Sequence, residues 1–186
     1  MSESVVRTRI LDVASNLFIS QGYNLTGINQ IIKESEIARA SLYHHFKSKN
    51  DLLIAYLKKT DEHFFSEIEE FLASFTEPRE KLLALVDHRV KRQLKHGFKG
   101  CRFVKISLEI SAEEEQKVTE VTSAHKEKFK LLIRNLVAQA NHKQILTDDL
   151  LTETIFLLLE GSTINGTLTR SPAALKKSRK IIETLL

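Results

Sequence analysis

Apolar residues recur every three or four positions through most of this chain, and this helical period constrains the fold more than any other feature. Sustained two-residue alternation, which is typical of half-buried strands, is almost absent. With 186 residues and 42% hydrophobic content, the chain is long enough to bury one good core and to carry a small additional module. We therefore predict an all-α fold of about nine helices.

Residues that start or stop helices set the predicted boundaries. Gly22 can end the first helix because glycine tolerates the left-handed conformation, and Thr26 is a plausible N-cap for a short second helix. Ser48 and Asp51 have the spacing of a capping box at the start of a long fourth helix. The remaining helices are expected to begin at Pro78, near Cys101, after a polar break at 111–115, at Asp148 and at Pro172.

Two short helices near the N-terminus have the lengths of a helix-turn-helix. The second helix of the pair, from about Arg39 to Phe46, follows a turn at 35–38. Leu42 and Phe46 lie four positions apart and can both face the core. In a helix-turn-helix the second helix lies in the major groove of DNA, so its exposed side chains are candidate DNA contacts.

The stretch 41–53, SLYHHFKSKNDLL, is too polar to be buried without partners. Tyr43 and Lys49 suit contacts with phosphate groups. Arg39, Ser41 and His44 suit base edges.

A longer ordered pattern resembles the N-terminal DNA-binding domain of the TetR/AcrR family of transcriptional repressors. The matching residues are Thr8, Ile10, Ala14, Leu17, Phe18, Gly22, Tyr23, Thr26, Ile31, Leu42, Tyr43, His45, Phe46, Lys49 and Leu52. The resemblance implies a homodimer that binds a near-palindromic DNA operator and is released by a small-molecule inducer. It implies a DNA-binding domain over 1–53, which includes the start of the fourth helix, and a regulatory and dimerisation domain over 54–186. The candidate DNA-binding residues are Thr26, Arg39, Ala40, Ser41, Tyr43, His44 and Lys49.

Three residues depart from the family pattern. The family commonly has glycine where this chain has Glu36, serine capping the recognition helix where it has Ala38, and often glycine where it has Ala40. Loss of a serine cap costs about 1 kcal/mol in typical helices. These departures concern the start of the third helix and its base contacts.

The C-terminal part resembles a subgroup of the same family through GCRFVK, SLEIS and LLLEGSTINGTL. That subgroup includes repressors responsive to drugs and flavonoids and one responsive to quinones and other electrophiles. The resemblance implies a sensor of small molecules or of reactive species, and both remain open. Cys101 is a candidate sensor because a helix N-terminus and nearby basic residues favour the thiolate, and Lys105 lies on the same helical face. The alternative is an inert, largely buried thiol.

The last two predicted helices each carry an apolar stripe, and together these stripes are the predicted dimer interface. Two such stripes per subunit can close a four-helix bundle. Gly161, Ser162 and Gly166 would allow close approach of the two backbones. The predicted interface consists of Leu151, Ile155, Leu158, Ser162, Leu175, Ser178, Ile182 and Leu185.

Charge and motif content narrow the function classes. A formal charge of +4 favours an anionic partner only weakly. The single cysteine excludes an intrachain disulfide, and the apolar runs are too short to span a bilayer, so we expect a cytoplasmic protein without membrane contact. No Glu-x-x-His pair, H-E-x-x-H, Walker loop or G-x-G-x-x-G occurs, so neither a metal site, a cofactor nor an enzyme is predicted. A helical interaction scaffold without DNA binding is the alternative function, and a helical-bundle enzyme is the least favoured one.

Overall fold

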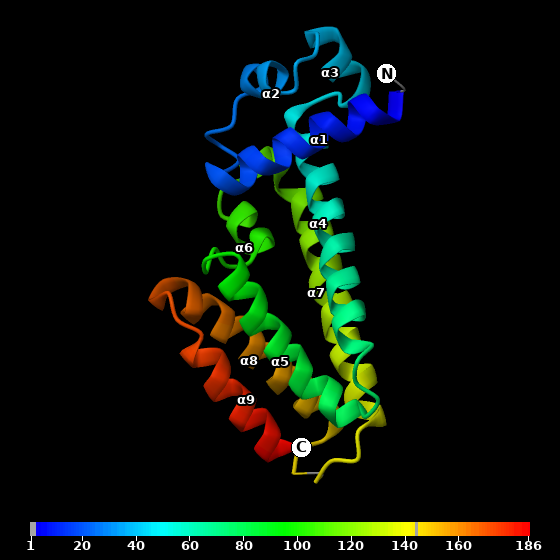
Figure 1. The fold of residues 1–186 in the computed structure, drawn as a ribbon, viewed down its shortest axis with the longest axis vertical. Coiled ribbons are helices and arrows are strands. Elements are labelled where there is room, and N and C mark those ends of the chain that lie inside the picture. Colours follow the sequence, from blue (N-terminus) through cyan, green and yellow to red (C-terminus); the bar gives the residue numbers. More distant parts are fainter. Residues whose placement is uncertain (1–2, 144) are drawn as a thin grey trace. The chain divides into compact units, whose positions relative to one another are not determined.

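The computed structural model describes residues 3–143 and 145–186, and these residues form helices and no strands (Figure 1). Over these described residues, the prediction of an all-α fold with about nine helices is confirmed. Within the described ranges, no helix has both the length and the apolarity that a bilayer span requires. The helices are α1 (Glu3–Ser20), α2 (Ile28–Glu34), α3 (Arg39–His45), α4 (Lys49–Leu72), α5 (Pro78–Lys95), α6 (Arg102–Ser107), α7 (Ala112–Gln139), α8 (Asp148–Thr169) and α9 (Ala173–Leu185).

The chain divides into two compact units. Unit 1 comprises Met1–Glu62 and Arg102–Ser123, and unit 2 comprises His63–Cys101 and Ala124–Leu186. The long helices α4 and α7 each contribute one part to unit 1 and the other part to unit 2. These units are defined by contacts, whereas the division at residue 53, which separates DNA binding from regulation, remains a prediction.

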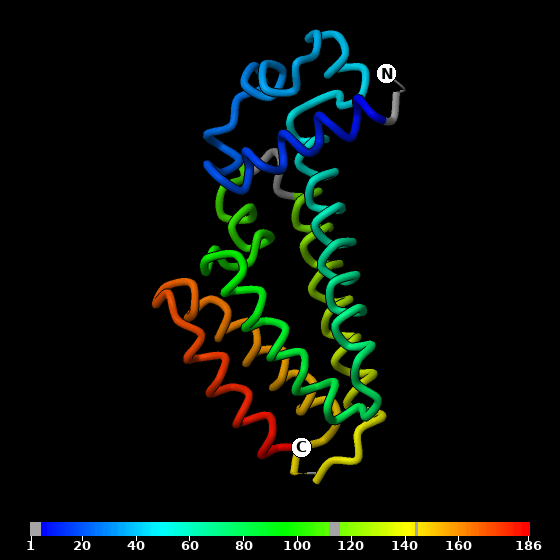
Figure 2. Tube along the Cα trace, viewed as in Figure 1, coloured from blue at the N-terminus to red at the C-terminus, as the bar shows by residue number. Residues whose placement is uncertain are grey.

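The core of unit 1 forms around an aromatic cluster. The ring of Phe18 on α1 makes T-shaped contacts with the rings of Tyr23 and Tyr56, at centroid distances of 5.3 and 5.5 Å. Ile31 of α2 and Leu42 of α3 are both fully buried. Helices as short as α2 and α3 are unstable alone, so this burial against α1 fixes them. Figure 2 follows the chain through α1, α2 and α3.

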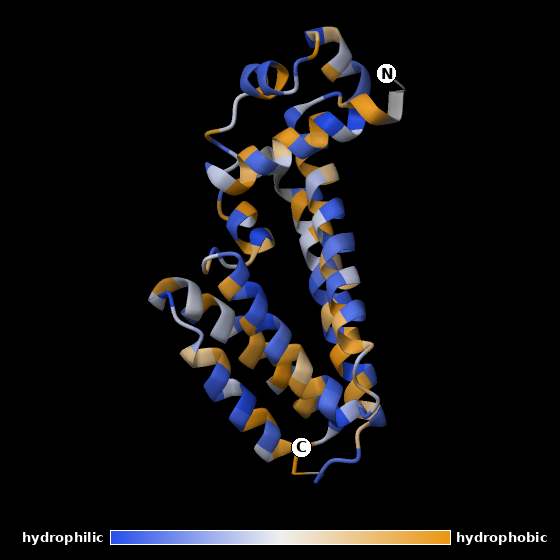
Figure 3. Cartoon of the chain, viewed as in Figure 1, coloured by the Kyte–Doolittle hydropathy of each residue, from blue (hydrophilic) through white to orange (hydrophobic). Residues whose placement is uncertain are grey.

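The core of unit 2 joins the second half of α4 to α5, α7, α8 and α9. The rings of Phe64 on α4 and Phe129 on α7 lie 5.7 Å apart. Helices α5, α8 and α9 pack against one another, and in Figure 3 the α8 ribbon is largely orange where it passes behind α5. Leu85, Ile155 and Ile182, one from each of these helices, are almost completely buried.

Several predicted boundaries are confirmed and others are wrong. Ser48 Oγ accepts a hydrogen bond of 3.0 Å from the Asp51 amide, as the capping pattern predicts. The N-cap of α2 is Gly27 rather than Thr26. Helix α7 begins at Ala112, before the end of the expected polar break.

Candidate functional site

Helices α2 and α3 form a compact helix-turn-helix. The turn is closed by backbone hydrogen bonds from Ser35 N to Ile31 O at 2.9 Å and from Glu36 N to Lys33 O at 3.2 Å. Glu36 has φ +52°, a left-handed conformation that costs residues with a Cβ about 1–2 kcal/mol. This conformation explains why glycine suits the position.

Helix α3 begins at Arg39, as predicted, although no side chain caps it. Ala38 is the N-cap, with an extended ψ of 147°. Its carbonyl accepts hydrogen bonds from the amides of Ser41 at 3.0 Å and Leu42 at 3.3 Å. The absence of a serine cap therefore leaves the start of α3 unchanged.

The outer face of α3 carries most of the candidate DNA-binding residues. Arg39, Ala40, Tyr43 and His44 are exposed, and Ser41 is half-buried. The Arg39 guanidinium lies 5.9 Å from the centre of the Tyr43 ring, within range of a cation–π interaction. The structure thus groups these side chains on one accessible surface, which we call the α3 face.

Two candidate DNA-binding residues lie away from the α3 face. The Lys49 ammonium lies 4.0 Å from the centre of the Tyr23 ring, so Lys49 is held against the turn after α1. Thr26 is fully buried, and its hydroxyl donates a hydrogen bond of 2.7 Å to Gly22 O. The prediction that the Thr26 side chain contacts DNA directly therefore does not fit this structure, because its hydroxyl is buried and bonded inside the fold.

Helix α1 brings two arginines to this region that sequence reasoning missed. The Arg7 guanidinium lies 5.0 Å from the centre of the Phe46 ring, at the end of α3. Arg9 Nη2 donates a hydrogen bond of 3.4 Å to Glu36 O in the turn. No local pattern could have identified these arginines, because packing of α1 against the helix-turn-helix places them there.

The surroundings of Cys101 differ from those predicted. Its sulfur lies 3.7 Å from Lys126 Nζ, and Lys126 also pairs with Glu160. The ammonium of Lys105 instead lies 3.9 Å from the carboxylate of Glu109. Lys126, which is distant in sequence, therefore replaces Lys105 as the observed neighbour of the thiol.

A second basic residue also pairs with Glu160. Arg89 Nη2 lies 3.1 Å from its carboxylate, and the Arg89 guanidinium lies over the rings of Phe64 and Phe129 at 5.0 and 4.6 Å. Burial acts to raise the pKa of Glu160, but the charges of Arg89 and Lys126 outweigh it and hold the pKa below its usual value. The carboxylate therefore stays ionised between two cations.

The predicted dimerisation stripes lie mainly inside the chain, so this part of the prediction is wrong. Ser162 Oγ and Ser178 Oγ hydrogen-bond to each other at 2.5 Å and join α8 to α9 within one chain. A Cβ added to Gly166 would approach the Gln93 side chain to 2.4 Å, so its close contact is also internal. Both helices bury these faces to complete the core. The buried residues are Leu151, Ile155, Ser162, Leu175, Ser178 and Ile182, and Leu158 and Leu185 are partly buried against the same core.

A different face of α8 is apolar and exposed. Its large side chains, Leu150, Leu157, Ile164 and Leu168, have exposed fractions of 55, 57, 47 and 78%. With Thr154 and Gly161 between them, these positions alternate in steps of four and three, which is the spacing of a coiled-coil seam. Ile181 on α9 is also 47% exposed. We call the four exposed side chains on α8 the α8 seam.

Comparison with known proteins supports the assignment of the N-terminal region. Residues 10–56 match the family described as bacterial regulatory proteins, tetR family. The HTH-type transcriptional regulator LmrA of Bacillus subtilis is 39% identical over 87 residues, which cover 46% of each chain. The HTH-type transcriptional repressor NemR of Escherichia coli K12 is 27% identical over 111 residues, which cover 59% of this chain and 56% of NemR. The chain thus matches about half the length of these relatives.

A solved structure extends the likeness to the whole fold. SCO4454, a TetR-family transcriptional regulator from Streptomyces coelicolor, has a TM-score of 0.84 and 25% identity. The match covers 98% of this chain and 94% of that one. The arrangement of an N-terminal helix-turn-helix followed by a larger helical region is therefore that of TetR-family regulators.

Proposed function

We propose, from the premise that this chain carries the N-terminal domain of the TetR family, that it is a transcriptional repressor. It binds a near-palindromic operator as a homodimer and leaves the DNA when an effector binds. The curated relatives are named as transcription regulators, and NemR as a repressor, which supports regulation rather than enzymatic catalysis.

The observation that carries this proposal is the α3 face. Arg39, Tyr43 and His44 project from a seven-residue helix whose Leu42 is fully buried. Arginine reads guanine edges, and tyrosine donates to phosphate oxygens, so the α3 face has the chemistry required in a major groove. Arg7 and Arg9 add positive charge from α1.

A second copy of the chain is the partner that best fits the α8 seam. The exposed apolar side chains of the seam run along α8 from Leu150 to Leu168, with Thr154 and Gly161 between them, and their heptad spacing suits packing against a helix of the same kind. A twofold dimer would place two α3 helices on half-sites separated by about one helical turn of DNA or a multiple of it. The dimer interface thus remains on the last two helices, as the sequence predicts, but uses their outer face.

Cys101 supports an electrophile as one class of effector. The Lys126 ammonium lies 3.7 Å from the Cys101 sulfur. In the proposed reaction the sulfur adds to an electron-poor carbon–carbon double bond: a sulfur–carbon bond forms, the π bond breaks, and the neighbouring carbon takes up a proton in place of the one that the thiol loses. A non-covalent ligand is the other class. Treatment with N-ethylmaleimide should release operator DNA from the parent protein but not from Cys101→Ser. Equal release from both proteins would favour the non-covalent class.

A mobility-shift titration tests the proposal itself. The full chain is mixed with fragments of the DNA upstream of its own gene and of neighbouring genes, at two salt concentrations. We expect a discrete complex with one fragment, weakened by salt because phosphate contacts release counterions. Failure to retard any fragment more strongly than random DNA would favour the interaction scaffold.

A further inference from the structure

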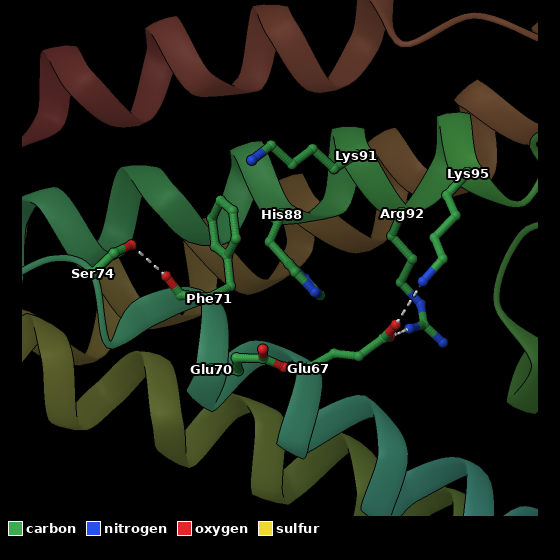
Figure 4. A pocket seen from close by; sticks show the side chains of 8 residues that line it. All are labelled: Glu67, Glu70, Phe71, Ser74, His88, Lys91, Arg92 and Lys95. Carbon is green, nitrogen blue, oxygen red and sulfur yellow. Dashed lines mark hydrogen bonds and ion pairs between the residues drawn. The ribbon is translucent and has the colours of Figure 1, made fainter.

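An open pocket of about 390 Å³ lies between the end of α4 and α5, within unit 2 (Figure 4). Glu67 and Phe71 line it from α4, and His88, Arg92 and Lys95 line it from α5. Its volume is in the range of sites that hold small molecules. We call it the α4–α5 pocket.

Positive charge exceeds negative charge in this pocket. Arg92 pairs with Glu67, and Lys95 Nζ lies 3.4 Å from the same carboxylate. Burial acts to raise the pKa of Glu67, but the charges of Arg92, His63 and Lys95 outweigh it and hold the pKa below its usual value. One ionised carboxylate thus faces two cations at this end, with exposed Glu70 and Lys91 further along the pocket.

His88 supplies a polar group that the fold leaves unsatisfied. It is only 7% exposed, and its Nδ1 is buried without a hydrogen-bond partner among the described residues. Figure 4 shows its ring extending from α5 toward the space that Glu67 enters from α4. Burial, reinforced by Arg92 and Arg89, lowers the pKa of His88 to about 4, so the ring is neutral at pH 7 and one nitrogen carries a proton to donate.

An aromatic wall adjoins His88. The rings of Phe71 and His88 lie 5.5 Å apart. The Lys91 ammonium lies 4.4 Å from the centre of the Phe71 ring, which gives this wall a positive rim. A flat, electron-rich ring suits such a surface better than an aliphatic chain does.

We propose that the α4–α5 pocket binds a small aromatic carboxylate. The ring of the ligand lies against Phe71, and its carboxylate accepts a hydrogen bond from the His88 imidazole beside Arg92 and Lys95. An uncharged ligand would leave the excess positive charge uncompensated, and a cationic ligand would add to it. The proposal rests on the proposed function, since it identifies the pocket as the effector site.

Binding of three naphthalene compounds to the DNA-free full chain tests this proposal by calorimetry. The probes are 2-naphthoate, its methyl ester and 2-naphthylmethylammonium, which share one ring system and differ in charge. We expect 2-naphthoate to bind at least about tenfold more tightly than the other two, as loss of a charged hydrogen bond predicts. Equal affinities, or no saturable binding of 2-naphthoate, would overturn the proposal.

Two variants and a matched control locate the site. Lys95→Met and His88→Leu should each weaken 2-naphthoate binding by about tenfold, since each removes one interaction with the carboxylate. Lys128→Met is the control, because Lys128 lies over the Phe65 ring at 4.0 Å on α7, outside the pocket. If His88→Leu fails to fold by circular dichroism, Lys95→Met decides alone. Parent-like affinity in Lys95→Met would overturn the site.

This calorimetry and the mobility-shift titration together separate the pocket assignment from the repressor assignment. If 2-naphthoate binds as expected but no DNA fragment is specifically retarded, the pocket assignment stands and the repressor assignment fails. If DNA is retarded but 2-naphthoate does not bind, the repressor assignment stands and this proposal fails.

Discussion

The carboxylate of Glu109 accepts a hydrogen bond of 2.7 Å from the backbone amide of Tyr23. Glu109 follows α6, whereas Tyr23 lies in the turn between α1 and α2, and both belong to unit 1. The Asn24 side chain also donates to Glu109 O at 2.6 Å. Gly22 fits beside them because it has φ +98° and because a Cβ there would approach Glu109 Oε2 to 3.0 Å. The segment after α6 thus anchors the turn that leads into the helix-turn-helix.

Glu109→Ala should therefore destabilise unit 1. Hydrogen bonds to charged groups contribute about 1.5–3 kcal/mol, and solvent can replace part of this, so we expect the free energy of unfolding to fall by about 1–2 kcal/mol. Urea denaturation measures the change. Glu120→Ala, an exposed acidic residue in the same unit, is the control and should have little effect. An unchanged midpoint for Glu109→Ala would show that this anchor is not stabilising.

Glu36→Gly should stabilise the protein. The left-handed conformation of Glu36 strains a residue with a Cβ, and removing its exposed side chain loses little packing. We therefore expect the free energy of unfolding to rise by about 0.5–1 kcal/mol. Glu34→Gly, two positions earlier within α2, should instead lower the free energy of unfolding by about 0.5–1 kcal/mol. Opposite shifts of the two thermal midpoints would support this reading, and a loss in both would contradict it.

Substitutions on the α3 face should separate sequence reading from general affinity. Arg39→Ala should weaken the free energy of binding to the preferred operator by about 1–3 kcal/mol, and it should reduce the preference for one base at a single base pair. Tyr43→Phe retains the ring near Arg39 and removes only the hydroxyl that we propose contacts phosphate, so it should weaken binding similarly on all sequences. Lys58→Ala, exposed on α4, is the control. Competition binding with operator variants distinguishes these outcomes, and parent-like binding by both α3 variants would defeat the assignment.

Lysine substitutions in the α8 seam should dissociate the dimer. Leu157→Lys places a charge in the proposed apolar interface, so the dissociation constant of the proposed dimer should rise at least about a hundredfold. Leu131→Lys, on an α7 residue that is 53% exposed, should leave the dimer intact. Sedimentation velocity measures both. Deleting residues 171–186 is a poorer test, because it also removes Leu175 and Ile182 from the core. A Leu157→Lys protein that remains dimeric would show that the α8 seam is not the dimer interface.

The depressed pKa of His88 predicts acid sensitivity. The pKa rises from about 4 in the folded state toward 6.5 on unfolding, so the unfolded chain binds more protons and stability falls as the pH drops through this window. Between pH 6.5 and 5 the loss should be about 1–2 kcal/mol. Burial is the main cause of the shift, the charges of Arg92, Arg89 and Lys91 add to it, and the charge of Glu67 opposes it. A folded His88→Gln protein should have a flatter urea stability profile over this range, and identical profiles would contradict the prediction.

Much of the fold could be predicted because its causes are local. Helix period and helix ends depend on hydrogen bonds and side chains within about four residues. Leu42 and Phe46 therefore identified the inner face of α3, and Ser48 identified the start of α4. The residues that match the family pattern over the helix-turn-helix likewise lie close to one another in the sequence.

Tertiary packing decided the rest, because it depends on residues that are distant in sequence. Helix α8 carries two apolar stripes, one through Leu151 and Ile155 and another through Leu150 and Leu157, and both have helical spacing. Packing against α5 and α9 buried the first stripe and left the second exposed. The same long-range packing placed Lys126 beside Cys101, because no periodic pattern specifies which side chains meet when separate helices come together.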